Sequence, residues 1–251
     1  MNTVSSRNTQ QSFTARCPQV RDAQWVCQKV KSFPHISSTK VTIPIANLAD
    51  KHAGLYEKFV KFPFASLFKS PEDNKIARIF EWHQRLIQKM NRARDEWGVL
   101  RKGDYKTVGA ILGQFKYNKL GNCGEDAFLS AAILKVNGVE NAYIAKLTID
   151  KLTQDHVACV FNKDGRPYSG KIEKDTMIID PWLGVADFAS KVFQKYKNLF
   201  SDYFIGLRPD SKISFGEIKR INLTGEETLL LSIKRPELLY PNSERCFMQK
   251  K

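Results

Sequence analysis

The most regular hydrophobic pattern in the chain lies at residues 70–97. Apolar side chains recur there at helical spacing and share their face with a histidine: Ile76, Ile79, Phe80, His83, Ile87 and Met90. Ser70 can cap a helix that begins here, and Pro71 suits its first position. The segment therefore predicts a long amphipathic helix. A shorter helix is expected at residues 107–115, whereas residues 40–48 begin with the alternation typical of a strand.

A different pattern begins at residue 121. The apolar stretch at 123–137 ends at Gly138, a residue common just after helices, and predicts a second well-defined helix. Beyond it we expect strands at 141–149, 155–162 and 176–182, a helix at 186–199, and two further alternating segments at 212–223 and 227–236. Helices followed by an antiparallel sheet predict an α+β fold rather than alternating βαβ units.

The composition divides the 251 residues into four parts. Residues 1–18 are rich in Ser, Thr, Gln and Asn and are expected to be disordered, because they cannot bury enough apolar surface to fold. Residues 19–118 are predicted to be mainly helical, 119–240 to form the α+β core, and 241–251 to be a tail. No stretch approaches the ~20 apolar residues of a membrane span, so we expect no transmembrane segment. The N-terminus lacks the apolar region of a secretory signal, which predicts cytoplasmic synthesis.

The chain is strongly basic, with a formal net charge of +14. Such a charge suits nucleic acid, an anionic membrane or an acidic protein. Lys and Arg are scattered along the whole chain, and no zinc finger, RNA-recognition signature or arginine-rich block is present. We therefore expect no specific nucleic-acid partner, and an acidic protein or an anionic membrane surface remains open.

The number and spacing of the cysteines limit what they can do. The odd number, in a large chain with no CxxC pair, argues against a disulfide framework and against a four-thiolate zinc site. At least one thiol is then free for chemistry. The five cysteines are Cys17, Cys27, Cys123, Cys159 and Cys246.

Three residues follow one another in an order that suits nucleophilic catalysis. Cys123 opens the second predicted helix, His156 lies near the start of one predicted strand, and Asp180 lies near the end of the next. A helix N-terminus and a nearby imidazolium both favour the thiolate, the reactive form of cysteine. A carboxylate that accepts a hydrogen bond from the other imidazole nitrogen fixes the ring. Gly121 and Gly124 flank the cysteine and would let a substrate backbone approach closely.

Strand alternation separates the candidate site from the core. His156 shares a strand face with Ala158, whereas Cys159 points to the opposite face and is predicted to be a core residue. This argues against a metal site formed by Cys123, His156 and Cys159, and we expect no metal ligands. Trp182 has the same parity as Asp180 and is predicted to shield the ion pair from water.

The motifs GNCGE, DHVACVF and IIDPW, on a helix start and two strands, resemble the papain-like and transglutaminase-like superfamily of cysteine enzymes, and more narrowly its bacterial effector and toxin members. The resemblance covers residues 121–183. It implies Cys123 as nucleophile, His156 as general base and Asp180 as its orienting partner. Members cleave peptides, deamidate or transamidate glutamine, or transfer acyl groups, and no metal or organic cofactor is implied.

The sequence thus predicts a cysteine-dependent acyl-transfer enzyme that acts on a protein. The short spacing from Cys123 to His156 resembles a transglutaminase core and favours glutamine deamidation or transamidation; proteolysis is the alternative, and a non-enzymatic basic binding protein is the second. Gln114 and Asn122 are candidates for the oxyanion hole, although Asn122 could equally cap the helix. The Ser/Thr/Gln-rich leader resembles those of effectors exported into a host cell without a cleaved signal.

Overall fold

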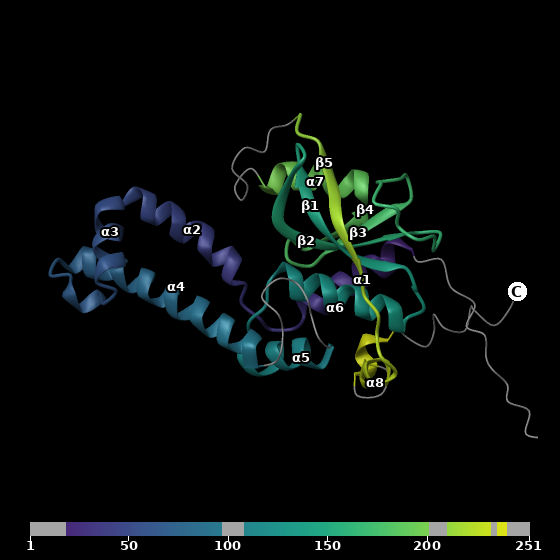
Figure 1. Ribbon diagram of the computed structural model, residues 1–251, viewed down its shortest axis with the longest axis horizontal. Coiled ribbons are helices and arrows are strands. Elements are labelled where there is room, and N and C mark those ends of the chain that lie inside the picture. The colour runs from purple at the N-terminus through teal and green to yellow at the C-terminus, as the bar shows by residue number, and fades with distance from the viewer. Residues whose placement is uncertain (1–18, 97–107, 201–209, 232–234, 240–251) are drawn as a thin grey trace, which may run out of the picture.

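A five-stranded antiparallel sheet forms the centre of the molecule, with strand order β4-β3-β2-β1-β5 (Figure 1). The computed structural model describes residues 19–96, 108–200, 210–231 and 235–239. The strands are β1 (Ala142–Ile149), β2 (Leu152–Asn162), β3 (Thr176–Asp180), β4 (Val185–Phe188) and β5 (Ile213–Arg220). Together with the helices described below, the sheet confirms the predicted α+β class.

A two-residue turn joins β1 to β2. Asp150 and Lys151 both have positive φ, 49° and 69°, as the tight turn favoured by the twist of a hairpin requires. The carboxylate of Asp150 also accepts hydrogen bonds from the Lys212 N–H (2.8 Å) and the Ser211 hydroxyl (2.7 Å). One aspartate therefore fixes both the hairpin and the approach to β5.

The two faces of the sheet support two separate hydrophobic clusters. On one face, Cys159 and Phe161 of β2 belong to the cluster formed with helices α1 (Val20–Lys31) and α6 (Cys123–Val136). On the other, Ala158 and Val160 pack with residues of α7 (Ala189–Phe200). The parity predicted from the sequence is confirmed, and Cys159 is a fully buried core residue.

Smaller helices complete the part of the molecule around the sheet. Helix α5 (Val108–Gly113) continues into a π-helical turn, η2 (Gln114–Asn118), just before α6. Helix α8 (Gly225–Leu229) and the turn η4 (Pro236–Leu238) follow β5. The hydrophobic cluster under α6 includes residues of α1 and α5, so the core extends beyond the predicted 119–240 into the N-terminal part of the chain.

A helical arm projects from the sheet and its covering helices (Figure 1). It consists of α2 (Ser38–Lys51), α3 (Ala53–Lys61), the turn η1 (Ala65–Leu67) and the long α4 (Pro71–Glu96). The arm has a hydrophobic cluster of its own, centred on Phe59 and Phe80 and including residues of α2. The predicted long helix is confirmed as α4.

Two predicted elements were wrong, and a third begins later than expected. Residues 40–48 are not a strand but part of α2, because Val41, Ile45, Leu48 and Ala49 also repeat at helical spacing and pack into the arm. The segment beginning at residue 227 is not a strand at its start, since Thr224 and Glu227 form a capping box that begins α8. The helix expected from residue 186 begins only at residue 189, after the unpredicted edge strand β4.

The predicted leader (1–18) and tail (241–251) lie outside the described residues. Within the described residues, no helix is both long enough and apolar enough to cross a membrane.

Candidate active site

Cys123 is the first residue of α6, and its position is fixed by the way that helix begins. Asn122 and Glu125 form a capping box, in which the Glu125 carboxylate accepts the Asn122 backbone N–H at 3.0 Å. Glu125 is fully buried. Arg94 of α4 forms a bidentate ion pair with it, with nitrogen–oxygen distances of 2.8 and 3.0 Å. The half-buried thiol therefore lies at a helix start that the arm itself holds in place.

His156 and Asp180 come together on neighbouring strands. The His156 Nε2 atom lies 2.8 Å from the Asp180 Oδ2 atom, and both side chains are almost completely buried. The Cys123 side chain also forms a hydrogen bond with His156. Since Nε2 is bound to the carboxylate, Nδ1 is the ring nitrogen left for the thiol. The structure thus brings together Cys123, His156 and Asp180, which are far apart in the sequence.

The environment of His156 favours its charged form. Burial, the largest single effect, lowers the pKa of the imidazole, but the charge and hydrogen bond of Asp180, followed by those of Cys123, raise it from 6.5 to about 10. The ring is therefore an imidazolium at neutral pH. A charged imidazole between a carboxylate and a thiol is the arrangement that stabilises a thiolate.

Asp180 accepts hydrogen bonds from two further groups. The Tyr196 hydroxyl of α7 donates to Oδ2 at 2.8 Å, and the Leu183 backbone N–H donates to Oδ1 at 3.2 Å. Burial and the adjacent carboxylate raise the pKa of Tyr196 well above 10, so its hydroxyl keeps its proton. Sequence analysis missed Tyr196, whose only signal was its place among the apolar positions of a helix.

Trp182 covers His156, with ring centroids 5.1 Å apart and only 3% of the tryptophan exposed. Its indole N–H donates to the Ser37 hydroxyl at 2.7 Å, and that hydroxyl in turn donates to the Asn122 side chain at 2.9 Å. The Lys40 ammonium lies over the same Trp182 ring, 5.0 Å from its centroid. The shielding position predicted for Trp182 agrees with these contacts, and the segment before α2 forms part of the site.

His35 anchors that segment to α6. Its Nε2 lies 3.1 Å from the buried Asp126 carboxylate, and its ring stacks on Phe115 at 4.3 Å. Burial alone would lower the pKa of His35, but the hydrogen bond and charge of Asp126 raise it. A Cβ atom on Gly121 would lie 2.4 Å from Phe115 and 2.8 Å from His35. The glycine therefore makes room for this packing, a reason that the sequence did not reveal.

The two oxyanion candidates have well-defined structural contacts. Gln114 is fully buried, and its amide nitrogen donates to the Leu120 carbonyl at 3.2 Å and lies 3.5 Å from the Glu125 carboxylate. These contacts support the start of α6 from beneath. Asn122 caps the helix. Gly124 is buried within the first turn of α6. An oxyanion role for either candidate stays a prediction.

The other described cysteines differ chemically from Cys123. Cys27 of α1 is buried, and desolvation, followed by the charge of Asp180, raises its pKa to about 12. Burial likewise raises the pKa of Cys159. Cys17 and Cys246 lie outside the described residues. Of the described thiols, only Cys123 combines partial exposure with a hydrogen bond to histidine.

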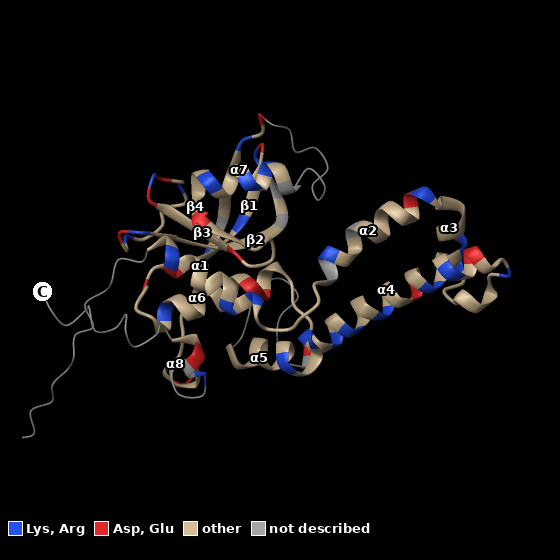
Figure 2. Cartoon of the chain, turned by 180° about the vertical axis from the view of Figure 1, so that it is seen from behind, with Lys and Arg blue, Asp and Glu red and all other residues tan. Residues whose placement is uncertain are grey.

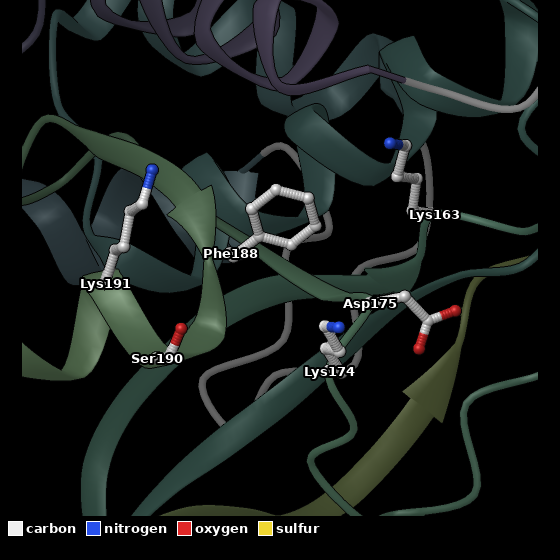
Figure 3. A pocket seen from close by; sticks show the side chains of 6 residues that line it. All are labelled: Lys163, Lys174, Asp175, Phe188, Ser190 and Lys191. Atoms are coloured by element: carbon white, nitrogen blue, oxygen red, sulfur yellow. The ribbon is translucent and has the colours of Figure 1, made fainter.

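A separate open pocket of about 550 Å³ lies beside β4 and the start of α7 (Figure 3). It is lined by Lys163, Lys174, Asp175, Phe188, Ser190 and Lys191, none of which belongs to the Cys123 site. Among the residues that the structure describes, no group of three or more His, Cys, Asp or Glu side chains could hold a metal ion.

Comparison with models of known protein families, with curated proteins and with solved structures found no match to this chain. The functional argument therefore depends on the geometry around Cys123.

Proposed function

We propose that this protein is a cysteine-dependent acyl-transfer enzyme that acts on a protein, with Cys123 as nucleophile, His156 as acid and base, and Asp180 as the group that orients the imidazole. The observation that carries the proposal is the geometry at the start of α6, where buried His156 lies 2.8 Å from Asp180 and forms a hydrogen bond with the Cys123 side chain. A purely structural cysteine needs neither a helix N-terminus nor an imidazolium partner.

The proposed chemistry has two steps. The Cys123 sulfur attacks an amide carbonyl carbon, and the negative charge that develops on the oxygen is stabilised by the Cys123 backbone N–H at the helix N-terminus. His156 gives the Nδ1 proton to the leaving amine, and a thioester remains. Water or a second amine then attacks the thioester, His156 takes up the proton of that nucleophile, and the thiolate leaves.

Within this class we favour a glutamine side chain as the acyl donor, so that ammonia is the leaving group. The support is the compact order of the site: α6 leads directly into the β1–β2 hairpin that carries His156, and β3 follows with Asp180. This order resembles the transglutaminase-like core more than the two-lobed arrangement of papain. We propose that the chain belongs to the papain-like and transglutaminase-like superfamily and acts as a bacterial effector.

Proteolysis is the second candidate, because the same three residues can attack a peptide bond. Mass spectrometry of a host-cell lysate incubated with the wild type or with Cys123→Ala distinguishes deamidation, transamidation and proteolysis. Glutamine-to-glutamate conversion indicates deamidation, cross-linked peptides that have lost ammonia indicate transamidation, and new N-termini indicate proteolysis.

Cys159→Ala is the matched control, because it removes a buried thiol on the opposite face of the sheet from His156. We expect this control to retain the modification pattern of the wild type and Cys123→Ala to lose it. Identical patterns from the wild type and Cys123→Ala would contradict the proposed function and favour a basic binding protein on a cysteine-enzyme scaffold.

A further inference from the structure

The far end of the arm exposes a cluster of large apolar side chains. Phe62, Phe64, Leu67 and Val60 are 61%, 60%, 58% and 56% exposed, and Tyr56 is 40% exposed. Single exposed apolar residues are normal on protein surfaces, but five within one segment of twelve residues indicate an interaction site. We refer to these five residues as the tip patch: Tyr56, Val60, Phe62, Phe64 and Leu67.

The backbone beneath the tip patch is well anchored. The Asn74 side chain of α4 donates to the carbonyls of Ala65 (2.7 Å) and Phe68 (3.4 Å). Phe59, from the same segment, is fully buried against Phe80 with ring centroids 5.6 Å apart. The segment thus buries one aromatic residue to hold its fold while it presents others to solvent. The exposure is a property of a formed structure and not of a frayed loop.

Lysine is the only cationic residue type in residues 53–70. Lys58, Lys61 and Lys69 are all exposed, and Glu57 is the one acidic residue in this range. The neighbouring carboxylates, Glu72 and Asp73, lie in the first turn of α4, where the helix dipole stabilises negative charge. Figure 2 shows that Lys and Arg also follow α4 from the tip toward the sheet. Over residues 50–78, six Lys and Arg residues stand against four carboxylates, so the tip patch lies in a mildly basic setting.

We propose that the tip patch binds an anionic phospholipid membrane, with the aromatic side chains inserted at the interfacial level and the lysines on the lipid headgroups. Amphipathic surface binding combines apolar burial of about 5–10 Å depth with attraction to anionic lipid. Each lysine near such a surface contributes about 1 kcal/mol. The arm then holds the Cys123 site away from the bilayer, because Ser37 precedes α2 and Arg94 lies in the last turn of α4, and both bind the start of α6.

The residue types favour lipid over a protein partner. Protein interfaces are enriched in arginine and depleted in lysine, whereas residues 53–70 contain three lysines and no arginine. A second copy of the chain is disfavoured because the same lysines would face one another. Lysine stems can also cover apolar surface while their ammonium groups reach the headgroups.

The proposal is tested by co-sedimentation of the full chain with phosphatidylcholine vesicles and with mixed phosphatidylcholine–phosphatidylserine vesicles. We expect binding to the mixed vesicles, loss of roughly ten- to a hundredfold in affinity for Phe62→Ser/Phe64→Ser, and retention in Phe62→Trp/Phe64→Trp, since tryptophan suits the interface. The control Tyr117→Ser/Leu229→Ser changes two residues of similar exposure, 65% and 57%, outside the arm, and should bind like the wild type.

The melting temperatures of the serine variants check that the arm remains folded; the buried cluster around Phe59 is unchanged in them. Equal binding by Phe62→Ser/Phe64→Ser and the wild type would overturn the proposal, as would absence of wild-type binding to the mixed vesicles. In the second case, concentration-dependent dimers that the serine variant abolishes would assign the tip patch to a second copy. Cys123→Ala should bind vesicles like the wild type, so that this test is independent of the proposed catalysis.

Discussion

His156 carries a charge that depends on identifiable neighbours, which makes its titration a direct test of the site. The chain has four histidines, so each ring can be followed by NMR, and the His156→Gln variant assigns the signal. We expect titration near pH 10 in the wild type. Asp180→Asn should lower that pKa more than Cys123→Ala does, because Asp180 contributes the larger favourable effect. A His156 signal that titrates equally in all three proteins would contradict the proposed pairing.

The same shift has a consequence for stability. Since the folded-state pKa of His156 lies above its ordinary value of 6.5, the protonated ring stabilises the fold fully below about pH 6.5, and this contribution is lost as the pH rises through about 10. The loss between these values should be smaller in Asp180→Asn, in which the folded-state pKa is less raised.

Two buried tyrosines provide a matched pair of substitutions with opposite expected effects. Tyr196→Phe removes a hydroxyl that donates to Asp180 and should cost about 1–3 kcal/mol in the free energy of unfolding. Tyr168→Phe removes a buried hydroxyl with no hydrogen-bond partner among the described residues, and should be neutral or stabilising. Urea unfolding measures both, and the alkylation rate of Cys123 reports whether Tyr196 also positions the site. Equal losses in the two variants would show that Tyr196 only fills space.

At this scale the sequence predicted the residues that have distinctive chemistry. A cysteine at a helix start, followed by a histidine and an aspartate on strands, is a pattern that can be recognised from residue type and order. Tyr196 and Ser37 could not be found in this way, since they act through hydrogen bonds made across a fold that brings distant segments together. Gly121 was noticed, but for substrate access and not for the rings that pack against it.

At the scale of elements, the contact between α4 and α6 connects the arm with the site. Arg94→Met should leave the buried Glu125 carboxylate without its ion partner and cost about 3–5 kcal/mol. Arg85→Met is the control on the same helix, because Arg85 is exposed and its pair with Glu81 contributes only about 0.3–0.5 kcal/mol. Urea unfolding of both variants checks the difference. A similar small loss in both would show that Glu125 does not need Arg94.

Element prediction succeeded where one pattern dominated, and it failed where two patterns were possible or where the element was too short to show one. The periodicity of α4 and the alternation of β1 and β2 each extend over eight or more residues, and both predictions are confirmed. Strand β4 has only four residues, too few for a pattern to emerge. Residues 40–48 contain β-branched residues in alternation as well as a helical repeat, and burial against the arm's other helices decides for α2.

At the scale of the molecule, the sequence indicated helices before residue 118 but not their arrangement. Hydrophobic periodicity shows which face of a helix is buried, and it does not show against what. Helix α1 packs on β3, β4 and α6, whereas α2, α3 and α4 form the arm. The division between sheet and arm therefore falls within the predicted helical region and could not be located from composition.

The net charge of +14 leads to a last prediction about how the molecule meets a protein substrate. Charges on an exposed surface are screened as the Debye length falls from about 8 Å at physiological ionic strength to about 3 Å at 1 M salt. The buried His156–Asp180 pair is screened far less, because both side chains are almost completely removed from solvent. Added salt should therefore raise KM for an acidic protein substrate several-fold in a vesicle-free assay and leave kcat nearly unchanged. A small neutral amide substrate is the control, since no long-range attraction guides it to the site. Equal effects of salt on the two substrates would show that the positive charge does not steer the encounter.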